Sequence, residues 1–321
     1  MKNAAIKNNA INSYLSSVFV YSIAVFMFRN LKYYKTTINP SAQFTLLGLL
    51  IVYLLLAPIF YFWLKREVPL SKPYLFLACL KKFIVNSITS KKEAIRRDEK
   101  VAFLFIMVKL FFLPTMISFF FDNLNSIISI LKNFNLYSLI ITSIFLLDTL
   151  IFSIGYAFEG KILKNIVKSV EPTLFGWAVA LVCYPPFNSY AGRFVPWGAN
   201  DHVFFWSAKL TIAFRILIVL LLIIYLWASF ALGTKASNLT NRGIVTKFPY
   251  SIVRHPAYLA KNLTWWIAIL PVMSMKFALG MFFWSTIYYF RAITEEKHLS
   301  HDPKYLSYCR KVGYKFIPYV I

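Results

Sequence analysis

The chain has 321 residues, of which 59% are apolar and 15% are charged, and its mean hydropathy is positive at +0.61. Soluble domains are nearer half apolar and a quarter charged, so the composition excludes an ordinary soluble protein and indicates an integral membrane protein. The formal net charge of +23 raises nucleic-acid binding as an alternative, which the placement of the basic residues tests. The three cysteines have no disulfide or zinc-ligand spacing, so we expect no metal.

Several apolar segments have about the 20 residues that a helix needs to cross a bilayer. They cover residues 11–28, 43–64, 101–121, 137–158, 173–190, 210–233, 256–275 and 277–292. This pattern predicts an all-α fold, a polytopic membrane helical bundle of about eight transmembrane helices. The fifth segment ends near Pro185 and Pro186, so a re-entrant segment is the alternative there.

The basic residues predict the topology. If all eight segments cross the membrane, both termini share one side with the loops near 65–100, 159–172 and 234–255. That side holds most of the 35 lysines and arginines. Because basic loops stay in the cytoplasm, we expect a multi-pass membrane protein whose N- and C-termini are both cytoplasmic. The same asymmetry explains the net charge without nucleic acid.

We interpret residues 1–233 as an N-terminal membrane scaffold. Its basic cytoplasmic loop, 65–100, has a more apolar centre at 74–88, which is typical of a helix lying on the membrane surface. Anchoring to anionic headgroups is favoured there over a dedicated lipid-substrate site. Lys109 and Asp148 lie at similar depths within their spans, which indicates an ion pair, with a proton or ion path as the alternative.

From Gly243 the sequence changes character, in GIVTKFPYSIVRHPAYLAKNLTWW. Pro256 suits the first turn of the seventh span, where a missing N–H costs no helical hydrogen bond. Arg254 and His255 then lie at the positively polarised start of a helix on the cytoplasmic face. Such a position favours an anion, above all a carboxylate. The alternative is that Arg254 only marks the cytoplasmic end of a span.

The eighth span leaves the membrane in RAITEEKHLS. Arg291 and Glu295 are four residues apart and share a helical face, so a surface salt bridge is one interpretation. Glu296 points about 100° away from Glu295, and the two carboxylates therefore need not serve one purpose. Adjacent acids are uncommon in a chain with only 12 of them, which makes this pair a candidate ligand-binding site. Asp302 and Pro303 predict the start of a short tail helix.

These residues together resemble the integral-membrane methyltransferases, a superfamily that includes the isoprenylcysteine carboxyl methyltransferases and the phospholipid methyltransferases. The pattern is G…PY…VRHPxY, a short hydrophobic hairpin, then EExxL…Y…Y…V…IP. The matching residues are Gly243, Pro249, Tyr250, Arg254, His255, Pro256, Tyr258, Glu295, Glu296, Leu299, Tyr305, Tyr308, Val312, Ile317 and Pro318.

The resemblance implies a methyltransferase whose methyl donor, S-adenosylmethionine, is bound on the cytoplasmic side by the C-terminal region 234–321. It implies a lipophilic acceptor, a lipid amine or an isoprenylcysteine-type carboxylate, which enters sideways from the lipid bilayer. The implied catalytic residues are Arg254 and Glu295. The implied cofactor-binding residues are Tyr250, His255, Pro256, Tyr258, Glu295 and Glu296.

The chemistry of the donor agrees with this set of residues. Its carboxylate suits Arg254, and its amine and ribose hydroxyls suit His255 with Glu295 or Glu296. Its sulfonium is a cation, which the aromatic faces of Tyr250, Tyr258 or Trp265 would favour.

Two features stand apart from the methyltransferase pattern. Ala260 replaces a glycine that is frequent in the family, and Lys261 adds a cation near a cationic donor.

The segments HPAYLA and YCRKVGYKFIPYVI also resemble membrane sterol reductases, although those enzymes generally lack the EExxL block. An NADPH-dependent, sterol-reductase-like enzyme is therefore the main alternative, and a non-enzymatic membrane module is the other.

Overall fold

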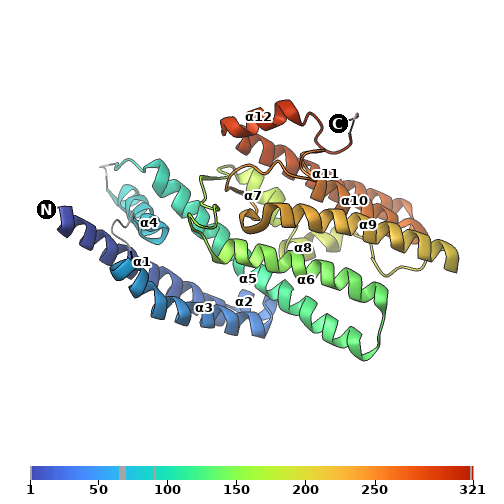
Figure 1. The fold of residues 1–321 in the computed structure, drawn as a ribbon, viewed down its shortest axis with the longest axis horizontal. Helices are drawn as coiled ribbons and strands as arrows, with labels where there is room; N and C mark the ends of the chain where they lie inside the picture. Colours follow the sequence, from blue (N-terminus) through green and yellow to red (C-terminus); the bar gives the residue numbers. More distant parts are fainter. Residues whose placement is uncertain (1, 65–69, 90–91, 319, 321) are drawn as a thin grey trace. The chain divides into compact units, whose positions relative to one another are not determined.

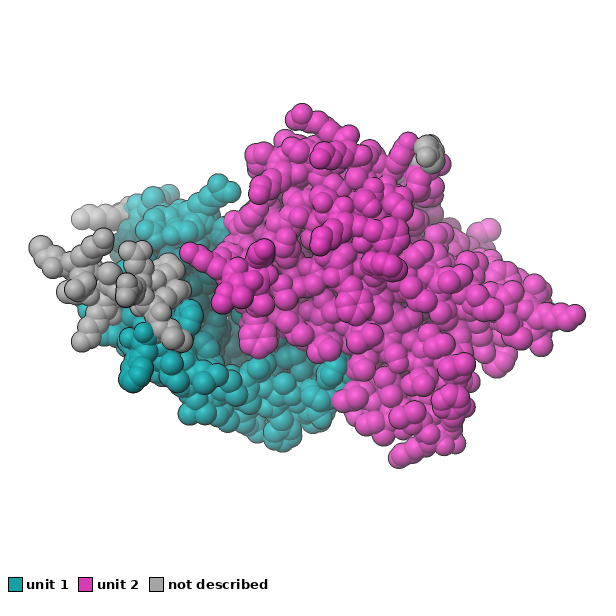
Figure 2. Space-filling model, viewed as in Figure 1, with its two compact units in different colours: residues 1–121 teal, residues 122–321 magenta. Residues whose placement is uncertain are grey.

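The computed structural model describes residues 2–64, 70–89, 92–318 and 320, and nearly all of its regular structure is helical (Figure 1). The all-α, polytopic fold predicted from the sequence is confirmed. Within the described residues, five helices are long and apolar enough to cross a membrane, and they are Asn8–Asn30, Pro40–Trp63, Arg97–Lys132, Leu136–Ala157 and Ala208–Lys235. The count of eight spans and the side of the termini stay predictions. The contacts divide the chain into two compact units, Met1–Phe121 and Asp122–Ile321 (Figure 2).

The first unit contains α1 to α4 and the beginning of α5. The bounds are α1 (Lys2–Asn30), α2 (Lys32–Thr37), α3 (Pro40–Pro58), which continues as the π-helical η1 (Ile59–Leu64), α4 (Lys72–Ile88) and α5 (Arg97–Lys132). The surface helix expected at 74–88 forms as α4, capped by the Ser71 side chain, which accepts a hydrogen bond from the N–H of Tyr74. Its place on the membrane surface stays a prediction, and residues 65–69 and 90–91 of the basic loop lie outside the described residues.

The second unit carries the candidate site. Its elements are the end of α5, α6 (Leu136–Ala157), β1 (Ser169–Val170), α7 (Leu174–Leu181), α8 (Phe187–Phe194), α9 (Ala208–Leu232), η2 (Gly233–Lys235), β2 (Thr240–Asn241), α10 (Pro256–Ala268), η3 (Leu270–Val272), α11 (Met275–Leu299) and α12 (Pro303–Lys311). Helix α9 packs against both α6 and α10. This arrangement buries apolar side chains between the three helices, among them Ile144, Leu222 and Ala260.

The second unit also contains a short strand pair and a helical hairpin. Strands β1 and β2 pair antiparallel, with Ser169 opposite Asn241 and Val170 opposite Thr240. Helices α10 and α11 are joined through η3 into a hairpin, whose interior holds Trp265 and Met281. The strand pair brings the segment before α7 next to the segment after α9. The polar residues of both segments therefore reach the site described below.

The expected fifth span, residues 173–190, is not one continuous helix. It is divided into α7 and α8, with 8 residues each, and Pro185 and Pro186 lie between them. Each helix is about 12 Å long at 1.5 Å per residue, well short of a bilayer core of about 30 Å. The expected seventh span is also shorter than predicted, because α10 has 13 residues and ends before Pro271. Proline lacks the N–H that would continue either helix.

Helix α11 makes a close backbone contact at Gly280 with the segment that follows α8. This residue is buried in α11, and a Cβ placed there would overlap the carbonyl oxygen of Pro196. We expect Gly280→Ala to lower the free energy of unfolding by about 1–3 kcal/mol, because the loop around Pro196 must move away. The melting temperature in detergent measures the effect. Gly192→Ala in α8 is the matched control, since nothing lies within 4 Å of its added Cβ. Equal melting temperatures for the two variants would contradict a close contact between residue 280 and the carbonyl of Pro196.

Candidate functional site

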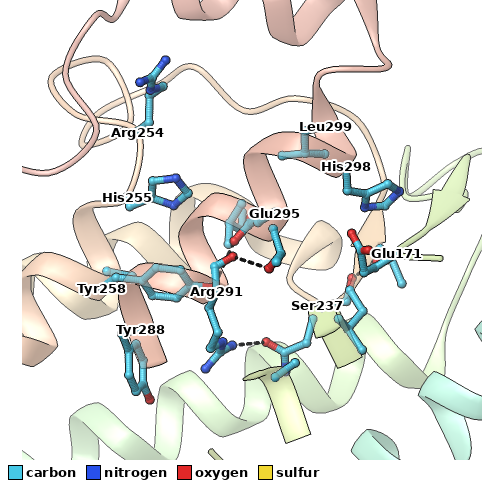
Figure 3. A pocket seen from close by; sticks show the side chains of 18 of the residues that line it. Glu171, Ser237, Arg254, His255, Tyr258, Tyr288, Arg291, Glu295, His298 and Leu299 are labelled. Carbon is cyan, nitrogen blue, oxygen red and sulfur yellow. Dashed lines mark hydrogen bonds between the residues drawn. The ribbon is translucent and has the colours of Figure 1, made fainter. Parts of the chain in front are cut away.

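A pocket in the second unit is lined from α6, α7, α9, α10 and α11 and from the two segments that β1 and β2 bring together (Figure 3). The cavity has a volume of about 140 Å³ and is partly open to solvent. Within the described residues, no group of three His, Cys, Asp or Glu side chains is placed to hold a metal ion.

Most of the residues predicted from the sequence meet at this pocket. Those that line it are Tyr250, Arg254, His255, Tyr258 and Glu295. Pro256 does not line it; it is the buried first residue of α10, the position expected from its missing N–H. The His255 side chain does not cap the helix, so it leaves the first N–H groups of α10 to other acceptors.

Glu296 also lies outside the lining of the pocket and is held by three basic side chains. Its Oε1 is 3.0 Å from Arg254 Nε and 3.2 Å from His255 Nε2, and its Oε2 is 3.4 Å from Lys315 Nζ. The Arg254 contact is an ion pair without hydrogen-bond geometry. Burial alone would raise the pKa of Glu296, but the His255 hydrogen bond and the charges of Arg254 and Lys315 outweigh burial and lower this pKa. The carboxylate is therefore ionised at neutral pH and offsets the charge of Arg254.

Glu295 points the other way, into the pocket (Figure 3). Its Oε2 accepts a hydrogen bond of 3.0 Å from the hydroxyl of Tyr258, and its side chain stays exposed to solvent. The two neighbouring glutamates thus have different surroundings, as their angular separation on the helix predicted. Glu296 pairs with the basic residues at the start of α10, and Glu295 faces the pocket.

Arg291 does not form the surface salt bridge with Glu295 that was one interpretation of their spacing. It is buried, its Nη2 donates a 2.9 Å hydrogen bond to Oδ1 of Asn238, and its guanidinium lies 5.2 Å from the ring centre of Tyr258 and 5.1 Å from that of Tyr288. Among the described ion pairs, none joins Arg291 to Glu295. The aromatic faces stabilise the guanidinium inside the pocket, one turn deeper than Glu295.

The C-terminal tail fixes the backbone at the start of α10. The N–H of Arg254 donates to the carbonyl of Tyr314 at 3.0 Å, and the N–H of His255 donates to the carbonyl of Lys315 at 2.9 Å. The His255 ring stacks on the Tyr258 ring with their centres 5.5 Å apart and their planes 5° from parallel. These contacts give both side chains a defined direction.

The tyrosines of the tail helix, α12, pack against the segment that precedes α10. Tyr305, Tyr308 and Val312 form a buried cluster against Tyr250 and Leu299. The Tyr308 hydroxyl also donates a 2.7 Å hydrogen bond to the carbonyl of Tyr250. The widely spaced residues of the C-terminal pattern are therefore close together in space, where they pack against the pocket residue Tyr250.

Trp265, which was a candidate partner for a sulfonium, does not line the pocket. Its ring packs edge-on against Trp197, at 4.2 Å between ring centres, and against Tyr288, at 5.1 Å. It belongs to the interior of the hairpin. Of the three aromatic residues named for that role, Tyr250 and Tyr258 line the pocket.

Sequence reasoning missed the polar residues that β1 and β2 contribute. Glu171 is buried at the pocket, where its Oε1 accepts a 3.0 Å hydrogen bond from the N–H of Thr173. Asn238, which binds Arg291, also donates through Nδ2 to the hydroxyl of Tyr184 at 3.1 Å. The scarcity of acidic residues was a signal that could have identified Glu171. Asn238 gave no such signal, because a two-residue strand pair places it.

His298 is a further lining residue that the sequence did not assign to the pocket. Its Nε2 lies 2.8 Å from the hydroxyl oxygen of Ser169, and its side chain is buried. Burial lowers the pKa of His298, because the charged ring loses its hydration. The imidazole is therefore neutral at neutral pH and suited to hydrogen bonding rather than to charge pairing.

Comparison with known proteins supports the interpretation of this region. Residues 203–302 match the family model described as phospholipid methyltransferase. The match covers α9 to α11 and includes the pocket residues Arg254, His255, Tyr258 and Glu295. The resemblance to the membrane methyltransferases is confirmed, and the match supports methyl transfer as the general activity. No curated protein and no solved structure matched the chain in the corresponding searches.

Proposed function

We propose that the pocket binds S-adenosylmethionine and that the chain transfers its methyl group to a lipophilic acceptor in the bilayer. The main support is the hydrogen bond between Tyr258 and Glu295. It joins the RHPxY segment to the EExxL segment across 37 residues, inside the region that matches a methyltransferase family. The two motifs thus contribute to one pocket, which opens to solvent.

The residues of the pocket fit the charged parts of this donor. One oxygen of Glu295 accepts a hydrogen bond from Tyr258, while the other has no hydrogen-bond partner among the described residues and is available to a donor amine or ribose hydroxyl. Arg254 is proposed to hold the donor carboxylate through its terminal nitrogens, since its Nε faces Glu296. The uncapped N–H groups at the start of α10 lie beside it and favour the same anion.

The chain's part in the reaction is mainly to position the reactants. When bound, the donor's sulfonium would supply a methyl carbon open to in-line attack by a nucleophile, with the C–S electrons left on sulfur. Tyr258 and Arg291 fix the wall of the pocket through their mutual contact, and Glu295 orients the polar end of the donor. Orientation of this kind can supply much of a rate enhancement without a covalent intermediate.

The acceptor is proposed to reach the pocket from the bilayer along α9. This helix carries a row of exposed apolar residues, Ile212, Ile216, Leu220, Ile223 and Trp227, which suits contact with lipid. On the opposite face of the same helix, Tyr225 and Ser229 line the pocket. A lipid lying against the exposed row would therefore be separated from the donor by the width of this one helix.

Labelled methyl transfer tests the proposal. Purified full-length protein in native lipid is incubated with donor carrying a labelled methyl group, and the lipid and protein fractions are then separated. We expect the label in the lipid fraction or on a lipidated protein, and none in a reaction without the chain. No label in either fraction, together with tight and saturable NADPH binding, would overturn the proposal in favour of a reductase.

A further inference from the structure

Lys261 is a basic residue of the pocket that the proposed function does not use. It lies on α10 six residues beyond His255, which is about 9 Å further along the helix axis. Its side chain lines the same pocket as Glu295. A lysine at this depth in an apolar helix bundle is costly, and such charges mark functional sites in membrane proteins.

The ammonium of Lys261 is surrounded by aromatic rings. Its Nζ lies 5.2 Å from the ring centre of Tyr225, 5.5 Å from that of Trp265 and 6.0 Å from that of Phe145. In the described part of the chain, no carboxylate lies within 4.0 Å of this nitrogen and no protein group accepts a hydrogen bond from it. Ring faces attract the charge, but they leave the three N–H donors of an ammonium without acceptors.

The acid next to this region is already engaged. Asp148 is buried on α6, and both of its oxygens accept hydrogen bonds from α9: Oδ2 from the Tyr225 hydroxyl at 2.6 Å and Oδ1 from the Ser229 hydroxyl at 2.5 Å. Asp148 therefore orients two lining residues of the pocket. Its expected pairing with Lys109, which belongs to the other compact unit, stays a prediction.

The acidic residues of the pocket and Lys261 are on different segments of its wall. Glu295 and Glu171 lie near the end of α11 and the β1 segment, whereas Lys261 lies about one and a half turns inside α10. We propose that Lys261 binds an anionic group of the methyl acceptor, a carboxylate or a phosphate. The acceptor is then an anionic lipid rather than a neutral or purely cationic one. This inference rests on the proposed function for the identity of the ligand as an acceptor.

Anionic and neutral lipids of the same chain length test the inference. Full-length protein in dodecyl maltoside, which has no phosphate, is titrated by calorimetry with oleate, phosphatidic acid, oleamide and oleylamine. We expect one saturable site that prefers oleate or phosphatidic acid over oleamide by about 10- to 100-fold, the range for a hydrogen-bonded charge. Binding of oleate alone identifies a carboxylate as the ligand, and binding of phosphatidic acid alone identifies a phosphate.

Variants at Lys261 separate this site from the basic surface of the protein. Lys261→Met is expected to abolish the preference for anionic lipid, and Lys261→Arg to retain it. Lys209→Met, at the exposed start of α9, is the matched control and should bind as the native chain does. A preference that survives in Lys261→Met, or that is missing from both the native chain and Lys261→Arg, would overturn the inference.

Titration of the donor distinguishes this inference from the proposed function. If Lys261→Met binds S-adenosylmethionine normally but has lost the anionic lipid, both proposals are supported. If the native chain binds oleate through Lys261 but binds no donor, the proposed function fails while the anion site stands. If the donor binds and Lys261→Met leaves lipid selectivity unchanged, only the anion site fails.

Discussion

Glu295→Gln is expected to lower kcat/KM for the methyl donor by about 10- to 100-fold, mainly through a higher KM. The amide oxygen of glutamine can still accept the hydrogen bond from Tyr258, so the local geometry is kept. What the variant loses is the negative charge, and a hydrogen bond to a charged group contributes about 1.5–3 kcal/mol. Initial rates of methyl transfer at varied donor concentration give the two constants.

The control for this variant is Glu93→Gln, the same chemical change at an exposed position outside the pocket. It should keep the native rate. The melting temperature of Glu295→Gln should also stay near that of the native chain, because its carboxylate is exposed and forms no ion pair among the described residues. A native KM in Glu295→Gln would remove Glu295 from the donor site.

Glu296→Gln is expected to act on stability, lowering the free energy of unfolding by about 2–3 kcal/mol. Removing one partner of a buried ion pair costs about 3–5 kcal/mol, and the Arg254 and Glu296 side chains retain 11% and 14% exposure. The variant leaves the charges of Arg254 and Lys315 without their carboxylate. Chemical unfolding in detergent measures the change, again with Glu93→Gln as the control. If the unfolding curve of Glu296→Gln matched that of the native chain, the Glu296 carboxylate would not stabilise the fold as proposed.

The same carboxylate predicts a dependence on pH. The pKa of Glu296 is lower in the folded chain than its ordinary value of 4.5, so the folded state favours the ionised form. Its contribution to stability is therefore complete above the unfolded pKa and is lost as the pH falls through the folded pKa. Below about pH 4.5 the difference in stability between the native chain and Glu296→Gln should shrink. A difference that stays constant down to the folded pKa would contradict the ion cluster.

The long helices were predictable because hydrophobic segments of about 20 residues have few alternatives to a membrane helix. The predicted helix lengths were wrong where an apolar segment contains proline, because average hydrophobicity does not register the missing backbone N–H. Residues 173–190 are apolar enough for a span, but Pro185 and Pro186 divide them into two short helices. In α10 the apolar character continues past Ala268, whereas the helix ends before Pro271.

The spacing of residues along the chain predicted part of the candidate site. The position of Pro256 predicted the start of α10, and the helical angle between Glu295 and Glu296 predicted their separate surroundings. Glu171 and Asn238 could not be predicted in the same way. Their places depend on the pairing of β1 with β2 across about 70 residues, which leaves no periodic pattern in the sequence.

Direct titration of the native chain with S-adenosylmethionine tests the central claim, that this pocket binds the methyl donor. Calorimetry on the full-length protein in native lipid, with NADPH titrated in parallel, should give one saturable donor site and no NADPH site. The donor site should weaken in Glu295→Gln and persist in Glu93→Gln. Saturable NADPH binding without any donor binding would contradict the proposed methyltransferase.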